Sequence, residues 1–332
     1  MKGVDFMNLY WSVYENLEAE VLSLADSIMF DNDQLGVYSL KIGDLIVRCA
    51  VEIESISKEL YLQEGGQFPV FDKNGEKHDL YFDTDCLDLL VKKWNINKKK
   101  LHVSSLKMDF SSSNLILTPL EKSNQRGKCQ WKKAYQAIKH NRAISLKQAN
   151  IKNLLNALGA LYILNLYYRN DSFWCNIPIY DKIPYMNLSK IFTPYICDIT
   201  SDITLLLSHR NTSKELLLMQ KMNESVYVKK YTDESIKEKR KIILRLVESL
   251  KMSNMSLLDW TNAMTPVFSK NSVQELVGNP ELLKWISNFN NLSLSEKKII
   301  QQVNVIAKEI VLNKNLSIFP EESFEEFLKA EN

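Results

Sequence analysis

Apolar side chains recur at helical spacing in two stretches near the start of the chain. The first, from about residue 8 to residue 29, has an apolar side chain every three or four positions, which predicts an amphipathic helix. The second, from about residue 39 to residue 61, predicts a longer helix whose apolar positions form one stripe. Gly65 and Gly66 are expected to end this helix. Its separate polar stripe consists of Arg48, Glu52, Ser55 and Glu59.

Between about residues 64 and 127 the pattern changes to short alternating runs. The segment QFPVFDKNGEKHDLYF has Asn-Gly between two such runs, which is the strongest short-range signal for a β-hairpin. VSSLKMDF and NLILTPL predict two more strands, and Asp83 or Asp85 is expected to cap a short helix that ends at Trp94. We therefore expect residues 64–127 to be an insertion with a small β element in a helical domain.

A basic helix and an almost wholly apolar helix follow this insertion. The basic helix is predicted from about Cys129 to His140, and the apolar run extends from Leu154 to Tyr168. Ser145 and Gln148 match the S-x-x-Q pattern of a capping box, so we expect them to start the apolar helix. The apolar run falls short of the roughly 20 residues that span a bilayer, which indicates a buried helix and not a membrane anchor.

The composition changes again near Asp171, where we place the boundary between two halves of the chain. Several prolines and aromatic residues as far as Pro194 suggest an irregular connector. From about Thr200 the pattern is mostly helical, and SLSEKKIIQQVNVIAKEIVL is expected to be a packed helix. The predicted fold class is therefore mainly α, with an antiparallel helical bundle over residues 1–170 and a mostly helical region without an assigned role over residues 171–332.

Composition excludes few functions. With 42 basic and 40 acidic residues the net charge is only +2, so a nucleic-acid site would have to be a local basic patch. The five cysteines are odd in number and far apart, which favours a reducing cytosol over a disulfide framework or a zinc site. The N-terminus lacks the apolar stretch of a signal peptide, so we expect a cytoplasmic protein. Phosphate-binding glycine motifs are missing, and we expect no cofactor.

The segment WKKAYQAIKHNR, from Trp131 to Arg142, carries the strongest candidate chemistry. On a helical wheel His140 points away from the apolar face, toward water or another surface. One interpretation is a solvated helix end, with Lys139, His140 and Arg142 lying favourably near the negative pole of the helix dipole. The other interpretation is that these residues line a cleft and form a catalytic or binding site. The apolar face of this helix consists of Trp131, Ala134, Tyr135 and Ile138.

Two parts of the chain carry a family resemblance. They are YSLKIGDLIVRCAVEIESISKELY, and WKKAYQAIKHNR followed by NIKNLLNALGALYILNLYYR. The order of elements is a long helix pair, an insertion and a second helix pair with Lys-His-Asn-Arg between its members. This arrangement resembles the HEPN superfamily, whose members are small helical bundles of bacterial defence, toxin and RNA-processing systems. The resemblance covers roughly the first half. The layout LTPL…WKKAYQAIKHNR is also similar to a group of bacterial mobile-element proteins.

The resemblance implies a metal-independent ribonuclease that acts as a homodimer, in host defence or as a toxin. In such enzymes a base helps the ribose 2′-hydroxyl attack the adjacent phosphate, while cations stabilise the developing charge. The implied roles here are His140 as the acid/base and Arg142 as a phosphate contact, with Lys139 and Asn141 assisting. The family has its Arg before its His, whereas the order here is His-Asn-Arg, so another arginine such as Arg48 would have to join.

The polar stripe of the second helix has two interpretations. Arg48 and Glu52, spaced i, i+4, could form a surface ion pair that contributes about 0.3–0.5 kcal/mol. Alternatively the stripe faces the same cleft as His140, and Glu52 orients an imidazole or a guanidinium. In that case Val47 and Val51 would help to form an apolar contact between two copies.

Non-enzymatic functions are the alternative. A HEPN-like module could bind RNA, a nucleotide or a protein partner such as a cognate antitoxin or another defence protein, and a helical scaffold is the plainest option.

Asn150, Asn153 and Asn156 are expected to form buried hydrogen bonds. His78 lies near several aspartates, but hairpin turns and helix caps use aspartate for local hydrogen bonds, so no metal site is expected.

Overall fold

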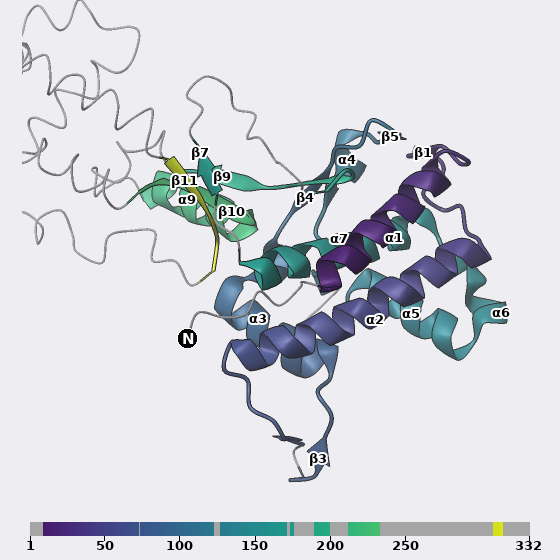
Figure 1. Ribbon diagram of the computed structural model, residues 1–332, viewed down its shortest axis with the longest axis horizontal. Helices are drawn as coiled ribbons and strands as arrows, with labels where there is room; N and C mark the ends of the chain where they lie inside the picture. The colour runs from purple at the N-terminus through teal and green to yellow at the C-terminus, as the bar shows by residue number, and fades with distance from the viewer. Residues whose placement is uncertain are drawn as a thin grey trace, which may run out of the picture.

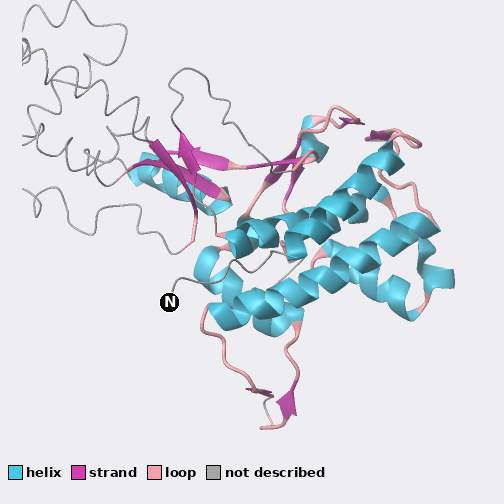
Figure 2. Cartoon of the chain, in the orientation of Figure 1, coloured by secondary structure: helices cyan, strands magenta, loops and turns pink. Residues whose placement is uncertain are grey.

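The computed structural model describes residues 9–72, 74–122, 127–170, 173–175, 189–199, 212–232 and 308–314. Figure 1 shows the long helices α1, α2 and α7 running beside one another, and Figure 2 shows how far helix outweighs strand in this part of the molecule. The helices are α1 (Leu9–Ala25), α2 (Leu40–Gln63), α3 (Leu87–Trp94), α4 (Ser112–Leu115), α5 (Gln130–His140), α6 (Arg142–Ser145), α7 (Ile151–Arg169) and α9 (Thr212–Glu224). Short non-α turns are η1 (Phe82–Cys86), η2 (Ile96–Lys98) and η3 (Leu146–Gln148).

The strands are short. They are β1 (Phe30–Asp31), β2 (Val70–Phe71), β3 (Lys77–His78), β4 (Leu101–Val103), β5 (Met108–Asp109), β6 (Ile116–Leu117), β7 (Phe173–Cys175), β8 (Phe192–Pro194), β9 (Ile196–Asp198), β10 (Tyr227–Tyr231) and β11 (Lys308–Leu312). The described residues are therefore mainly helical, which confirms the predicted fold class at this coarse level.

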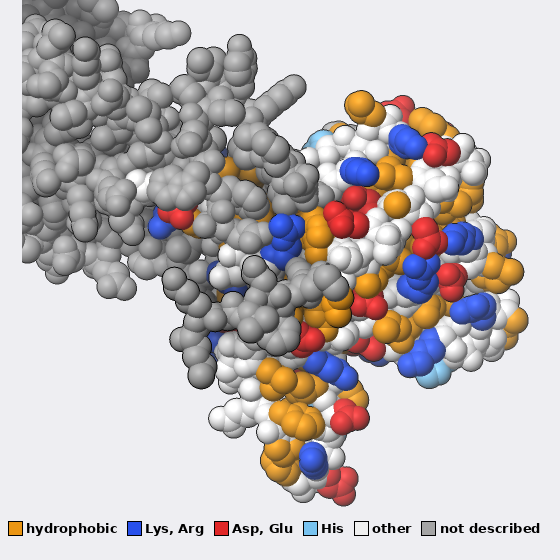
Figure 3. Space-filling view, viewed as in Figure 1, with side chains coloured by type: hydrophobic (Ala, Val, Ile, Leu, Met, Phe, Trp, Pro, Cys, Tyr) orange, Lys and Arg blue, Asp and Glu red, His pale blue; other side chains and the backbone are white. Residues whose placement is uncertain are grey.

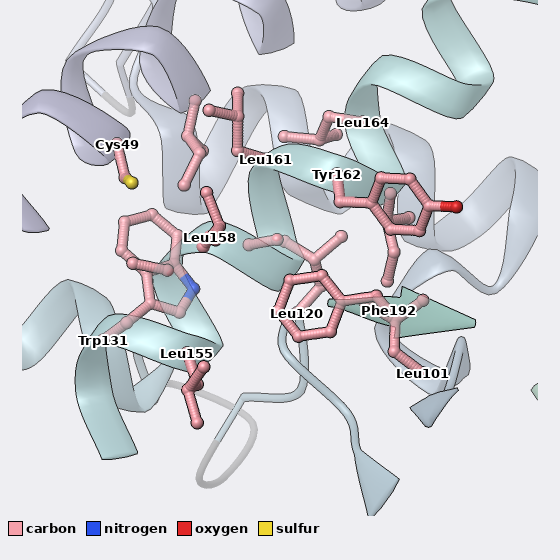
Figure 4. Close-up of a cluster of buried hydrophobic side chains, with 14 of the residues drawn as sticks. Cys49, Leu101, Leu120, Trp131, Leu155, Leu158, Leu161, Tyr162, Leu164 and Phe192 are labelled. Atoms are coloured by element: carbon pink, nitrogen blue, oxygen red, sulfur yellow. The ribbon is translucent and has the colours of Figure 1, made fainter. Parts of the chain in front are cut away.

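Helix α7 is the centre of the core. It packs against α2 most extensively and also against α1 and α5, and nearly all of its side chains are buried. A helix that is apolar all round has no solvent face to present, which is why this segment lies inside the bundle. Figure 4 shows Leu155, Leu158 and Leu161 of α7 packed among side chains from other elements. Those neighbours include Cys49 of α2, Trp131 of α5, Leu101, Leu120 and Phe192.

The beginnings of α2 and α7 follow different sequence signals. Ser39 caps α2, because its hydroxyl oxygen accepts a hydrogen bond from the backbone N–H of Ile42 at 3.1 Å. Helix α7 is capped by Asn150, whose side-chain oxygen accepts from the N–H of Asn153 at 3.0 Å. The prediction that Ser145 and Gln148 start α7 is wrong, since α6 ends at Ser145 and η3 intervenes.

The predicted β element of the insertion is confirmed in part. Strands β2 and β3 form the antiparallel hairpin expected around Asn-Gly, and Gly75 takes the positive φ of 80° that such a turn favours. Strand β4 lies between β6 and β8 with antiparallel pairing on both sides. The expectation of one continuous strand in VSSLKMDF is wrong, because this segment contains the last residue of β4 and the two-residue strand β5, and β5 pairs in parallel with β1.

The helix predicted to end at Trp94 is present, but neither aspartate caps it as expected. The side chain of Asp85 accepts a hydrogen bond from the backbone N–H of Tyr81 at 2.7 Å, within the π-helical turn η1 that precedes α3. Residue 86, which directly precedes α3, provides no side-chain hydrogen bond. The two aspartates therefore belong to the turn and not to the helix start.

The later part of the chain contains strands where helix was expected. Strand β10 pairs in parallel with β9 and antiparallel with β11, and β7 lies on the far side of β11. The prediction that the segment ending at Leu312 is entirely helical is wrong over β11. Tyr227 and Ile310 belong to the same buried cluster as α7, so the core continues beyond the boundary proposed near Asp171. Residues 233–307, for which mostly helical structure was also expected, lie outside the described residues.

Candidate functional site

The end of α5 forms a turn that projects its basic residues outward. Helix α5 ends at His140, and Asn141 begins α6 by accepting a hydrogen bond on its side-chain oxygen from the N–H of Ile144 at 3.4 Å. Ile144 is 81% exposed on this turn. We call the exposed basic residues Lys139, His140, Arg142 and Lys147, which lie on α5, α6 and η3, the basic tip.

The tip is held in place by close packing behind it. Gly43 of α2 lies so near Ala149 that a Cβ atom at residue 43 would be 3.2 Å from the Ala149 Cβ. The N–H of Ser39 also donates to the carbonyl of Ala149 at 3.2 Å. Together with the buried Ile138 on the inner face of α5, these contacts fix where the α5–α6–η3 turn leaves the core.

His140 has the geometry of an exposed base. Its Nε2 lies 3.1 Å from the side-chain oxygen of Gln136, one turn earlier in α5. Because an amide oxygen only accepts, this bond places the ring proton on Nε2. The neutral ring then has Nδ1 as a lone-pair acceptor. The prediction that His140 faces away from the core is confirmed.

The lysines of α5 divide between the inside and the outside of the bundle. Lys132 is buried, forms an ion pair with Glu54 of α2, and lies 5.1 Å from the ring centroid of Tyr135. Lys139 is exposed, and its ammonium nitrogen lies 5.6 Å from the centroid of the same Tyr135 ring. One lysine therefore ties α5 to α2, while the other adds its charge to the surface.

Arg48 and Glu52 do not join the basic tip. The guanidinium of Arg48 donates to Glu20 of α1 at 2.5 Å, which corrects the predicted ion pair between Arg48 and Glu52. Partial burial raises the pKa of Glu52. Among the described residues no hydrogen bond or ion pair links either side chain to His140 or Arg142. Of the pair proposed as an apolar dimer contact, Val51 is exposed and Val47 is partly buried against the core.

Charge is segregated along the chain in a way that the sequence analysis did not use. Residues 122–170 contain ten Lys and Arg residues and no Asp or Glu. Some of these cations are neutralised from outside this segment: Lys122 pairs with Asp88 and Lys132 with Glu54. Within the described part of the chain, the cations of the basic tip have no carboxylate partner. In Figure 3, Lys and Arg side chains and a His gather in the region where Figure 1 draws α5 and α6.

A cleft of about 460 Å³ lies where the β6 region meets the start of α7. Its apolar wall includes Leu35, Ile116, Pro119 and Leu155. Its polar groups include Asn114, Gln130, Asn156, Lys122 and Lys152. These residues come from four separate parts of the chain, so no local motif could have revealed the cleft. We call it the β6–α7 cleft.

Thiol and metal chemistry have little support in the described residues. Burial raises the pKa of the Cys49, Cys86 and Cys129 thiols to about 12 in each case, which disfavours a thiolate nucleophile. Throughout the described ranges, no group of three or more His, Cys, Asp or Glu side chains could hold a metal ion. His78 instead contacts the carbonyl of Asp79 at 2.6 Å and stacks on Tyr81.

The asparagines of α7 have local roles. Asn150 is the helix cap, and the buried Asn153 donates to the carbonyl of Gln148 at 2.8 Å, which confirms the expected buried hydrogen bonding for that residue. Asn156 donates to the carbonyl of Lys152 at 2.8 Å and also lines the β6–α7 cleft.

Comparisons with known proteins add no relationship: no family model, curated protein or solved structure matches this chain. No helix among the described residues is both long enough and apolar enough to cross a membrane.

Proposed function

We propose that this protein is an RNA-binding, HEPN-like protein and that its basic tip contacts the phosphate backbone. The observation that carries the proposal is the charge segregation. Residues 122–170 form a run of 49 residues without a carboxylate, and several of their basic side chains are exposed together on the α5–α6–η3 turn. Backbone phosphates are the polyanion that such a surface attracts most strongly, because contact with Lys and Arg releases condensed counterions. No carboxylate of the described residues pairs with these side chains, so they are accessible to such a contact.

A salt titration tests this proposal. Anisotropy of a fluorescein-labelled single-stranded RNA should show log K falling with log salt, by about 0.7 for each phosphate contacted. Removing Lys139, Arg142 and Lys147 together should lower that slope by about 2. The matched control is Lys107→Ala, which removes an exposed lysine paired with Asp26 elsewhere on the surface. Equal slopes for the wild type and the triple variant would reject the basic tip as the RNA site.

A second candidate function is metal-independent RNA cleavage, and the exposed Nδ1 of His140 favours it. A neutral imidazole with an open acceptor can take the proton of a 2′-hydroxyl as that oxygen attacks the adjacent phosphate, and can return it to the 5′-oxygen as the P–O5′ bond breaks. A guanidinium two residues away can stabilise the charge that develops on the phosphate. Because Arg48 is bound to Glu20, we propose that a second arginine comes from another copy of the chain, so that a homodimer carries this activity. Host defence or toxicity is the role that the HEPN resemblance implies.

Cleavage is tested with RNA and its 2′-deoxy analogue in EDTA. We expect products with a 2′,3′-cyclic phosphate from the RNA alone, lost in His140→Ala and retained in His78→Ala, a matched histidine on the hairpin. Growth arrest on expression, relieved by His140→Ala, would support a toxin. RNA retention without cyclic-phosphate products would leave the binding function and reject the nuclease.

A further inference from the structure

We infer that the β6–α7 cleft binds one unpaired nucleotide whose base carries an exocyclic amino group, namely adenine, cytosine or guanine. This inference deepens the proposed function and rests on it for the biological ligand, but it can be tested with free mononucleotides. The cleft volume of about 460 Å³ lies within the range of roughly 300–1,000 Å³ typical of small-molecule pockets. Four features of the cleft select this ligand.

The apolar wall suits a flat base. Leu35 and Leu155 contribute from the α7 side, and Ile116 and Pro119 from the segment around β6. Pro119 is itself held by the core, because its carbonyl accepts a hydrogen bond from the indole N–H of Trp131 at 3.0 Å. A base that leaves the stack loses its apolar contacts with the neighbouring bases. The apolar side chains of the cleft can provide new contacts for the face of such a base.

The amide groups of the cleft present acceptors. Asn114 uses its side-chain N–H to donate to Asn32 at 2.8 Å, and Asn156 uses its own to donate to the carbonyl of Lys152 at 2.8 Å. Each bond orients the amide and leaves its oxygen available to a ligand. Two acceptors fit the two hydrogens of the exocyclic amino group of adenine, cytosine or guanine, whereas uracil has two carbonyl oxygens and a single ring N–H at its polar edge.

The two lysines of the cleft differ in availability. Lys122 donates to Asp88 and to the carbonyl of Asp83, so its charge is already balanced. Lys152 is exposed and, within the described residues, forms no ion pair, while its backbone N–H donates to the carbonyl of Leu35 at 3.1 Å. The phosphate of a bound nucleotide is therefore expected at Lys152.

Lys152 also connects the cleft with the basic tip. Lys147 of the tip precedes it by five residues, so the two backbones are at most about 18 Å apart. The side chain of Asn150, between them, donates to the carbonyl of Lys147 at 3.1 Å and so fixes the path of this segment. An RNA strand whose phosphates lie on the tip can thus place one base in the cleft.

The test measures the affinity of the full chain for AMP, CMP, UMP and inorganic phosphate by titration calorimetry. We expect AMP and CMP to bind more tightly than UMP, and phosphate alone to bind far more weakly than either. Asn156→Leu should weaken AMP by about fivefold, the effect of one hydrogen bond. Lys152→Ala, at an exposed position, should weaken AMP and UMP by similar factors, whereas Lys107→Ala, whose lysine pairs with Asp26, should leave mononucleotide affinity unchanged.

Equal affinity for AMP, UMP and phosphate would overturn the inference, and so would AMP binding that survives both Asn156→Leu and Lys152→Ala. The outcome is separable from that of the proposed function. If the tip variants have no effect on RNA while AMP still binds selectively, the RNA-binding proposal fails and the nucleotide site stands. If RNA binds through the tip but AMP and UMP are not distinguished, only the nucleotide site fails.

Discussion

The guanidinium of Arg48 on α2 donates a hydrogen bond to the carboxylate of Glu20 on α1 at 2.5 Å. Lys41 also donates a hydrogen bond to this carboxylate. Both hydrogen bonds lower the pKa of Glu20, and the bond from Lys41 has the larger effect. Arg48 thus links two helices of the bundle. Arg48 therefore does not serve as the arginine that the HEPN resemblance would place beside His140 of the same chain.

We therefore predict that Arg48→Ala changes stability slightly and RNA affinity hardly at all. The Arg48 side chain is 41% exposed, and exposed ion pairs contribute about 0.2–1 kcal/mol. Urea denaturation should show a loss within that range, while anisotropy should show RNA binding close to that of the wild type. Arg142→Ala is the matched control, with the opposite expectation. A large loss of RNA affinity in Arg48→Ala would place Arg48 in the site after all.

A second prediction concerns the buried carboxylate of Glu18, which is only 3% exposed. It accepts hydrogen bonds from the Tyr14 hydroxyl at 2.8 Å, from the Ser189 hydroxyl, and from the N–H of Lys190 at 2.9 Å. Glu18→Ala should lower the free energy of unfolding by roughly 3 kcal/mol or more, because several buried donors lose their acceptor. Urea denaturation gives this value.

Glu15→Ala, an exposed glutamate one turn earlier on the same helix, is the control for Glu18→Ala and should be nearly neutral. Limited proteolysis adds a local readout. Since Glu18 binds the backbone of residues 190 and 191, its loss should expose this segment to cleavage before the helices unfold. Similar stability of the two variants would show that the contact is dispensable.

Much of the helical core could be predicted because its signals are local. The apolar stripe of α2 and its Ser39 cap lie within one continuous segment, and so does the apolar run of α7. Strand β11 was missed because KEIVL, taken alone, suits a helix or a strand, and its pairing with β10 joins residues about eighty positions apart. The β10–β9 pairing is likewise non-local.

The candidate site was predictable only in part. The outward direction of His140 follows from helical periodicity, and the charge segregation could have been counted from the sequence. The partner of Arg48 could not, because Glu52 at i+4 and Glu20 on another helix are equally acceptable until the helices are packed. The β6–α7 cleft depends on residues as distant as Leu35 and Asn156, which only the tertiary structure brings together.

A third prediction separates the two candidate caps of α7. Asn150→Ala should cost about 1 kcal/mol of stability, because the N–H of Asn153 loses its acceptor. Ser145→Ala should be close to neutral, since Ser145 ends α6 and provides no side-chain cap to η3. Thermal unfolding of both variants measures the difference. The reverse order of the two effects would restore the capping box at Ser145 and Gln148.

A fourth prediction follows from Lys99, whose side chain is fully buried and whose ammonium group has no hydrogen-bond partner among the residues that the structure describes. Burial lowers the pKa of Lys99 to about 7, against 10.5 for an ordinary lysine. Between these two values the unfolded chain binds one proton more than the folded chain, so Lys99 makes stability rise as the pH increases from about 7 to 10. Below pH 7 both states are protonated, and the cost of the buried charge is constant.

Lys99→Met should remove this dependence, because it fills the same space without a titrating group. The free energy of unfolding of the variant minus that of the wild type should be largest at pH 6–7 and should fall toward pH 10, by on the order of 4 kcal/mol. Urea denaturation across this pH range measures the free energy of unfolding of both proteins. Subtracting one from the other cancels the contributions of the titrating groups that they share. Lys98→Met, which removes the neighbouring charge that adds to the effect of burial on the Lys99 pKa, should show only a weak trend of the same sign. A difference that does not change with pH would mean that the Lys99 ammonium finds an acceptor in the folded protein.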